Sequence, residues 1–335
     1  PRYSEIESRS NVDLSTQIGH VKLKIPIISS NMKTVTGPKM AAEIAKLGGL
    51  GLLHRFCTIE DNLDMYTQAW QLVENVSCPS GLGQNIGVSI GVKDEDKERF
   101  EKLYNLGART FCIDVAHGHH ILVKKMLEWI DSFKVMRKLQ DPLEKLTIIA
   151  GNIATPEAYN DLCDWGADVV KVGIGPGSAC ATRKNTGVGI PQLYALEMIN
   201  DALIHHPQPA SIIADGGLVH VGDIAKALKF ADAVMLGSMF SGTAESPGHV
   251  FRNEQNEFYK VYGGSASGEN KGENKFVEGV MKTVKFKGKV KYIVREIEDG
   301  LRSTFSYVGV DNLIAFQTKC EFIHISDASR TESKI

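Results

Sequence analysis

Residues 146–175 read LTIIAGNIATPEAYNDLCDWGADVVKVGIG, and this stretch contains the unit from which the rest of the chain is built. An apolar run, Leu146 to Asn152, is followed by the amphipathic segment PEAYNDLCDW and then by a second apolar run, Val169 to Gly175. Strands that are apolar on both faces and separated by a helix are typical of parallel βαβ units. The stretch therefore predicts two parallel strands joined by a helix.

The same unit recurs along the whole chain and predicts eight strands. The six further apolar runs are Lys24 to Ser30, Leu50 to His54, Gly87 to Gly91, Thr110 to Ala116, Ser211 to Gly217 and Ala233 to Ser238. Amphipathic segments such as PKMAAEIAKL and GDIAKALKF lie between them. No G-x-G-x-x-G follows the first strand, as an open dinucleotide-binding sheet would require. We therefore predict an α/β protein with one (β/α)8 TIM-barrel domain spanning residues 1–335.

One segment is too long for a simple barrel loop. Residues 245–289 follow the eighth predicted strand and are rich in Gly, Ser, Asn, Glu and Lys. Such an insertion beside a barrel mouth predicts a mobile lid. Within it, the lysines of KTVKFKGKVK alternate with apolar residues, which predicts a solvated strand or hairpin.

The composition of the chain argues against several classes of partner and of fold. The chain has 335 residues and a formal net charge of -2, which gives no electrostatic reason to expect a nucleic-acid or membrane partner. No apolar run reaches the ~18 residues of a membrane span. The six cysteines lie far apart without a C-x-x-C pair, which argues against a zinc cluster and a disulfide-stapled secreted fold. We expect a cytoplasmic protein with small-molecule ligands.

Polar and glycine residues gather just past seven of the eight predicted strands, in SSNM, HR, DVAHG, GN, GIGPGSAC, DGG and GS. A barrel brings all these strand ends to one face, where its active site is built. The loop 173–183, GIGPGSACATR, also carries a thiol, Cys180. A free cysteine is most often a small buried hydrophobe, which suits Cys112 in a strand and Cys163 in a helix. On a polar glycine loop, Cys180 is instead the candidate nucleophile.

The loops after the seventh and eighth strands, residues 215–217 (DGG) and 237–238 (GS), predict a phosphate site. Asp215 is an acceptor suited to ribose hydroxyls, and Ser178 is a further phosphate donor. Asp114 ends the fourth strand at the predicted mouth, with His117 the best placed histidine. The histidine pairs at 119–120 and 205–206 have no carboxylate at ligand spacing, so we expect them on the solvated surface and predict no metal cluster.

The loop GIGPGSACATRKNTGVGIPQ resembles the signature loop of the IMP dehydrogenase and GMP reductase family. Similar matches run along the chain, for example in PIISSNMKTVT, IDVAHGH, VMLGSMFSGTAESPG and GLRSTFSYVG. Most IMP dehydrogenases carry a pair of CBS domains before the third strand, whereas ENVSCPSGLGQ here runs directly into NIGVSIG. The Arg-Tyr pair on the dehydrogenase flap is also missing from residues 263–279. Within the family, these features favour the reductase.

The resemblance implies a purine-salvage reaction in which GMP and NADPH give IMP, ammonia and NADP⁺. Cys180 would add to purine C2, expel ammonia and leave a thioimidate-like intermediate that takes up hydride. Thr182 matches the family threonine, and Glu278 in VEG matches the glutamate that works with it as a proton relay. The resemblance thus makes Cys180, Thr182 and Glu278 the expected catalytic residues.

It also implies the binding residues. The nucleotide contacts would be Ser30, Asn152, Ser178, Asp215, Gly216, Gly217, Gly237, Ser238, Gly264, Ser265 and Gly279. The cofactor contacts would be Asp114, Val115 and Ala116 for the nicotinamide, and Ser8, Arg9, Arg55, Ser303, Thr304, Phe305 and Ser306 for the rest of NADPH, across a subunit boundary of a homotetramer. The carbonyls of Gly175, Gly177 and Cys180 would hold a monovalent cation such as K⁺.

Two positions depart from the family pattern, Lys33 where Asp is usual and Ala181 where Thr or Ile is common. Lys33 is either a surface lysine or a charge for the 2′-phosphate of NADPH. Two alternatives to the reductase stay open. One is an IMP dehydrogenase without CBS domains, and the other is a nucleotide-binding protein without activity. The intact set of Cys180, Thr182 and Glu278 argues against the second.

Overall fold

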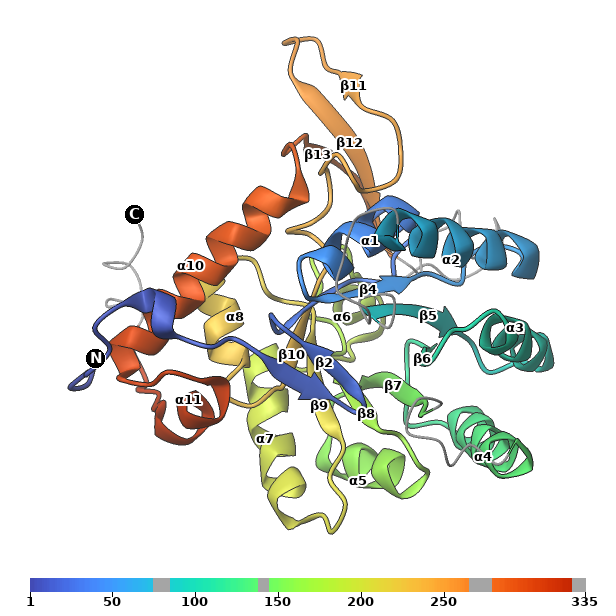
Figure 1. Ribbon diagram of the computed structural model, residues 1–335, viewed down its shortest axis with the longest axis horizontal. Coiled ribbons are helices and arrows are strands. Elements are labelled where there is room, and N and C mark those ends of the chain that lie inside the picture. Colours follow the sequence, from blue (N-terminus) through green and yellow to red (C-terminus); the bar gives the residue numbers. More distant parts are fainter. Residues whose placement is uncertain (75–84, 138–144, 265–278, 327–335) are drawn as a thin grey trace.

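The computed structural model describes residues 1–74, 85–137, 145–264 and 279–326. Its centre is a closed barrel of eight parallel strands, which confirms the predicted fold class (Figure 1). The strands are β3 (Ile27–Ser29), β4 (Leu50–Leu53), β5 (Ile86–Ile90), β6 (Thr110–Asp114), β7 (Thr147–Ile153), β8 (Val169–Val172), β9 (Ser211–Asp215) and β10 (Ala233–Leu236). Going round the barrel, they follow chain order, and β10 pairs with β3 to close it.

Helices surround the barrel (Figure 1). They are α1 (Pro38–Lys46), α2 (Ile59–Glu74), α3 (Asp94–Asn105), α4 (Ile121–Met136), α5 (Pro156–Asp164), α6 (Thr182–Thr186), α7 (Gln192–His205), α8 (Val221–Ala227), α10 (Val290–Val308) and α11 (Leu313–Lys319), with the 3-10 turn η1 (Arg9–Asn11) before them. In α10, the residues Val290, Val294, Ile297, Leu301 and Phe305 are buried, three or four positions apart. This spacing is that of one face of a helix, so α10 packs on the barrel through a single apolar stripe.

A hairpin that the sequence did not predict closes the amino-terminal end of the barrel. Strands β1 (Thr16–Ile18) and β2 (Val21–Leu23) pair antiparallel. Ile18, Val21 and Leu23 join the barrel's interior cluster, which includes Leu52 and Val169. Because apolar side chains fill this end, a polar ligand can be bound only at the opposite, carboxyl end of the strands.

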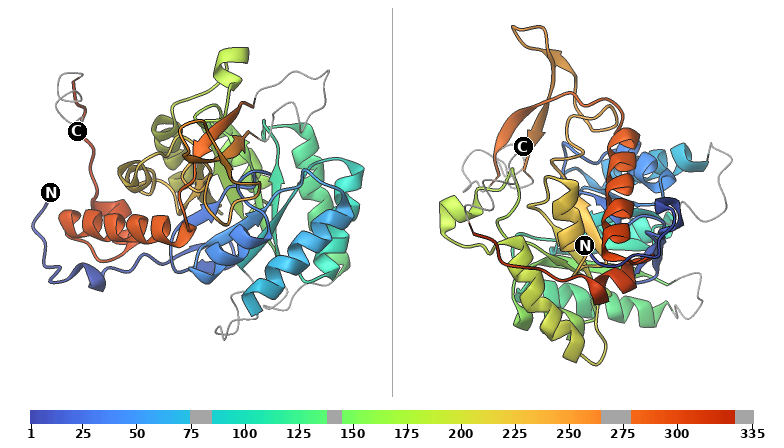
Figure 2. Two further views of the ribbon diagram at one scale, coloured as in Figure 1. Left: turned by 90° about the horizontal axis from the view of Figure 1, so that it is seen from above. Right: turned by 90° about the vertical axis from the view of Figure 1, so that its left-hand side faces the viewer.

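The predicted lid segment contains a three-stranded antiparallel sheet of β11 (Phe251–Arg252), β12 (Phe258–Gly263) and β13 (Met281–Lys285). Figures 1 and 2 show this sheet standing out from the barrel. Strand β13 confirms the strand predicted in the lysine-rich segment. The mobility of the segment stays a prediction. Among the described residues, no helix is long and apolar enough to cross a membrane.

Candidate functional site

The loop after β8 holds Cys180 beside a hydroxyl. The Cys180 Sγ atom lies 3.0 Å from the Thr182 Oγ1 atom, and the cysteine is half-buried. The backbone N–H of Cys180 donates to the Gly177 carbonyl at 3.0 Å, which turns the loop back on itself. A thiol and a hydroxyl at this distance can exchange a proton directly, so the pair is equipped for nucleophilic chemistry.

The lid segment is joined to this loop through the backbone. Cys180 forms an antiparallel bridge with Gly279, and the Val280 N–H donates to the Ala179 carbonyl at 3.0 Å. A side chain at Gly264 would lie 2.7 Å from that same carbonyl, so only glycine fits. The structure therefore brings Gly264 and Gly279 to the Cys180 loop, and their contact with the nucleotide stays a prediction. Two predicted site residues, Ser265 and Glu278, lie outside the described residues.

A tyrosine that sequence reasoning missed stands among the predicted phosphate residues. The Tyr262 side chain is buried, and its hydroxyl donates to the Met32 Sδ atom at 4.0 Å and interacts with Ser178. A Cβ atom placed on Gly237 would lie 3.3 Å from the Tyr262 hydroxyl and 3.6 Å from the Ser30 Cβ atom. Burial raises the pKa of Tyr262, and its bond to Ser178 offsets this only in part. The phenol is therefore neutral and lies close to Ser30, Ser178 and Gly237.

The glycines after β9 let two loops meet. Gly216 and Gly217 have φ values of 90° and 79°, a region that side chains disfavour. A Cβ atom on Gly216 would approach the Gly177 nitrogen to 3.2 Å. Two lysines of the lid segment reach the same area, because Lys282 donates to the Ser178 carbonyl at 3.3 Å and Lys287 to the Ser238 carbonyl at 2.6 Å. Two lysine ammonium groups thus lie beside the loops that carry Ser178 and Ser238.

The floor of the mouth is a polar network around Lys171, a second residue that sequence reasoning missed. The Lys171 ammonium lies 2.9 Å from Asp114 Oδ1 and 3.0 Å from Asp215 Oδ2. Burial raises the pKa of Asp114, but the charge and hydrogen bond of Lys171, with Arg55 and Asn31, outweigh it and hold that pKa below its usual value. The sequence feature that could have identified Lys171 is that it is the single lysine in the apolar run VVKV.

Asn152 connects this floor to the Cys180 loop. Its side-chain amide donates to the Gly173 carbonyl at 2.7 Å and to Asp215 Oδ2 at 2.9 Å. Its buried Oδ1 atom accepts no hydrogen bond from any described residue. A buried acceptor that is left over in this way costs free energy unless a ligand satisfies it. The network is therefore suited to a ligand with an N–H or O–H group.

The wall beside Asp114 carries the mouth residues predicted for the cofactor. The Arg55 guanidinium donates to the Asp114 carbonyl at 3.2 and 3.1 Å. Val115 is half-buried and Ala116 exposed. Lys33 is exposed, and its charge contributes with burial to lowering the pKa of His54 to about 4. Positive charge thus faces this side of the mouth.

The other predicted cofactor residues lie elsewhere. Ser8 and Arg9 adjoin α10, which packs on the outside of the barrel, and the Arg9 guanidinium stands 5.9 Å from the Tyr307 ring. Residues 303, 304 and 306 are half-buried there. Phe305 is fully buried and stacks on Phe316 at 4.4 Å between ring centroids, so its side chain is not available to a ligand. Within one chain, this group does not join the mouth.

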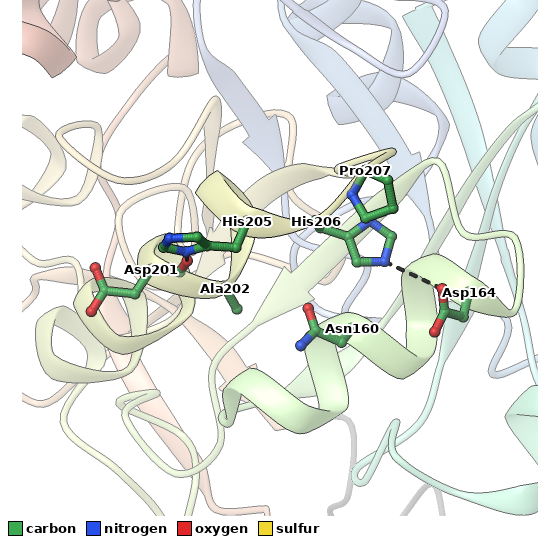
Figure 3. Close-up of a pocket in the computed structure, with 7 residues that line it drawn as sticks. All are labelled: Asn160, Asp164, Asp201, Ala202, His205, His206 and Pro207. Atoms are coloured by element: carbon green, nitrogen blue, oxygen red, sulfur yellow. Dashed lines mark hydrogen bonds and ion pairs between the residues drawn. The ribbon is translucent and has the colours of Figure 1, made fainter.

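Of the two histidine pairs, His120 and His205 are exposed, as predicted, whereas His119 and His206 are partly buried and each contacts an aspartate. His119 lies 2.7 Å from Asp161, and His206 lies 3.3 Å from Asp164, both aspartates being on α5. Figure 3 shows His206 beside Asp164 in a hollow between α5 and α7, with Asn160, Asp201, Ala202, His205 and Pro207. These helices end at the face opposite to the mouth. No group of three or more His, Cys, Asp or Glu among the described residues could hold a metal ion.

Comparisons with known proteins agree with this geometry. The whole chain, residues 1–335, matches the model of the IMP dehydrogenase / GMP reductase domain. The chain belongs to this family.

Three similar proteins of the IMP dehydrogenase / GMP reductase family are all named GMP reductase. The chain is 39% identical to the GMP reductase of Leptothrix cholodnii, over 92% of this chain and 88% of the relative. It is 37% identical to the GMP reductase of Lactobacillus acidophilus, over 92% and 87%. It is 38% identical to the GMP reductase of Bacillus subtilis, over 93% and 89%. The similarity thus covers the barrel, the Cys180 loop and the lid segment together.

Proposed function

We propose that the chain is a GMP reductase, an NADPH-dependent oxidoreductase that converts GMP to IMP and ammonia in purine salvage. The observation that carries the proposal is the Cys180 thiol 3.0 Å from the Thr182 hydroxyl in the family's signature loop. The shared name of relatives that are similar over nearly their whole length supports the same activity.

Cys180 is the nucleophile. Its thiolate forms a bond to C2 of the purine, and the C2 amino group leaves as ammonia with a proton delivered to its nitrogen. Thr182 is close enough to pass that proton, and Glu278 is the acid that replenishes it. When NADPH is bound, it supplies the hydride that replaces the sulfur at C2. The thiolate is then released and the product is IMP.

The nucleotide occupies the pocket between the loops after β8, β9 and β10. Tyr262, Ser178 and the two lysines beside these loops suit its phosphate, because they offer donors and positive charge. Asp215 accepts from the ribose hydroxyls. The remaining contacts are Ser30, Asn152, Gly216, Gly217, Gly237, Ser238, Gly264, Ser265 and Gly279.

NADPH fits the wall of the mouth on the side of β4 and β6. Arg55 supplies positive charge there. Asp114, Val115 and Ala116 line the nicotinamide position. Ser8, Arg9 and the Ser303 to Ser306 segment lie outside the barrel in one chain, so they serve the mouth of a neighbouring subunit in a homotetramer.

Three further assignments complete the proposal. The protein is cytoplasmic and forms one barrel domain, with residues 245–289 closing over the nucleotide. A monovalent cation is held by the carbonyls of Gly175, Gly177 and Cys180. One of these three carbonyls, that of Gly177, already accepts the Cys180 N–H. Dependence of the rate on K⁺ over Na⁺ or Li⁺ tests this last assignment.

A paired assay tests the activity. The protein is incubated with GMP and NADPH in one arm and with IMP and NAD⁺ in the other. We expect GMP-dependent oxidation of NADPH with release of ammonia, and no formation of NADH. Reduction of NAD⁺ by IMP would identify an IMP dehydrogenase instead, and no turnover in either arm would identify a silent nucleotide-binding protein.

A further inference from the structure

Lys171 lies inside the barrel, where a charged side chain is unusual. Along β8, Val170 and Val172 pack outward against the helices, whereas Val169 belongs to the interior cluster. Side chains alternate along a strand, so Lys171 points into the barrel on top of Val169. Gly151 stands opposite in the β7 register, and a Cβ atom there would lie 2.7 Å from that of Lys171. The glycine thus makes room for the lysine.

The ammonium group bridges carboxylates from two different strands. It contacts Asp114 at the end of β6 and Asp215 at the end of β9, with its own strand between them in the barrel. The two contacts of 2.9 and 3.0 Å require the carboxylate oxygens to lie within about 6 Å of each other. The side chains of Asp114 and Asp215 are 14% and 20% exposed, at the mouth, whereas that of Lys171 is 2% exposed.

Among the described residues, few other charged groups lie near the Lys171 ammonium and the two carboxylates. The Arg55 guanidinium acts on Asp114, and the Tyr262 hydroxyl lies near enough to Asp215 to interact electrostatically. Below them is the Cys112 thiol, whose pKa burial raises to about 12, so it is neutral. Two aspartates against one lysine leave one net negative charge, and Arg55 balances it from the rim. Without Lys171, two partly buried carboxylates within about 6 Å of each other would repel, and such repulsion raises the pKa of one of the pair.

We propose that Lys171 is a positioning residue that keeps Asp114 and Asp215 ionised and aimed at the mouth, so that one side chain orders the nicotinamide and ribose subsites together. The inference rests on the proposed function, which gives the two aspartates their ligands. It explains why a lysine stands inside an otherwise apolar strand. Removing its charge should make ligand binding depend on pH, which loss of packing alone would not do.

The test compares GMP binding by Lys171→Met with the wild type from pH 5.5 to 8.5. Methionine has a similar length and no charge. The ratio of the two dissociation constants is taken at each pH, which cancels the titration of the GMP phosphate. We expect the ratio to rise as pH falls, approaching tenfold per pH unit below the raised pKa of the carboxyl pair. A ratio that does not change with pH would overturn the proposal.

Two further variants sharpen the result. Lys171→Met/Asp114→Asn leaves a single carboxylate, so its ratio should no longer depend on pH. Lys260→Met is the matched control, because Lys260 is also buried but its ammonium contacts the carbonyls of Thr243 and Ser246. Its ratio should also stay constant. A pH-dependent ratio for either variant would contradict the charge argument.

Failure of the Lys171 variants to fold would also test the proposal. If Lys171→Met does not fold but Lys171→Met/Asp114→Asn does, the unbalanced charge is the cause and the proposal is supported. If neither folds while Asp114→Asn alone does, Lys171 acts through packing and the proposal is overturned. The wild type is assayed with GMP and NADPH in parallel. Its inactivity would refute the proposed function, whereas an active wild type with a constant Lys171→Met ratio would refute only the role of Lys171.

Discussion

His54 should make the folded protein sensitive to mild acid. The residue directly follows β4, next to Arg55, and is 5% exposed, and its Nδ1 atom accepts the Phe56 N–H at 3.2 Å. Burial, followed by the charges of Lys33 and Arg99, lowers its pKa from 6.5 to about 4. Between pH 6.5 and about 4, the unfolded chain therefore carries a proton on His54 that the folded protein does not bind. Stability is complete above pH 6.5 and falls as pH drops toward about 4.

The size of the effect follows from the two pKa values. Each pH unit between them costs up to ~1.4 kcal/mol, so from pH 7 to pH 5 the single histidine costs ~2 kcal/mol. The variant His54→Asn keeps an acceptor for the Phe56 N–H but does not titrate. Urea unfolding of both proteins at the two pH values gives the difference, and the other titrating groups cancel between them.

We expect the wild type to lose ~2 kcal/mol more than His54→Asn over this range. Lys33→Met is a graded control in the wild-type background. It removes the smaller cause of the pKa shift and leaves burial, so it should shrink the pH-dependent loss only in part. Equal losses in the wild type and His54→Asn would refute the argument from burial.

Four further predictions concern the site. Cys180→Ala should bind GMP but lose turnover, and activity above a few percent in an NADPH assay would remove the cysteine from its role. Asp215→Ala should weaken GMP binding by ~1.5 to 3 kcal/mol for each charged hydrogen bond lost, and equal weakening of NADPH binding in calorimetry would contradict the ribose assignment. Tyr262→Phe should weaken GMP far more than guanosine, because the phenol donates to the phosphate; equal effects would exclude that contact. Glu278→Gln should slow ammonia release ~10² to 10⁴-fold yet keep the NADPH burst from IMP and NADP⁺, and loss of both would point to lid positioning.

The eight barrel strands could be predicted because their signal is local. Each is a short apolar run that ends in polar residues, and the strand order follows from parallel pairing of neighbours. The β1–β2 hairpin could not be found in this way. Its strands are three residues each, TQI and VKL, with a polar residue in both, and they become strands because the barrel end buries Ile18 and Val21.

The loop around Cys180 could be predicted, but its surroundings could not. Cys180 and Thr182 are two residues apart, so their contact is local. Tyr262 comes close to Ser30 and Ser178 only because β12 folds back toward the loop after β3, where the Gly263 N–H donates to the Thr34 hydroxyl. Lys171 was visible as a lysine in an apolar strand, but its partners come from strands 57 and 44 residues away. Contacts at such separation are set by the fold and not by spacing in the sequence.

The most direct test of the central claim is the mass of the Cys180 peptide after the reverse half-reaction. The protein is mixed with IMP and NADP⁺, so that C2 loses hydride as the Cys180 sulfur bonds to it, then quenched in acid, digested and analysed by mass spectrometry. We predict that the Cys180 peptide gains the mass of the purine nucleotide, less the hydrogen atoms lost, and that Cys180→Ala shows no adduct. An adduct on a different cysteine, or turnover of GMP by the Cys180→Ala variant, would contradict the account.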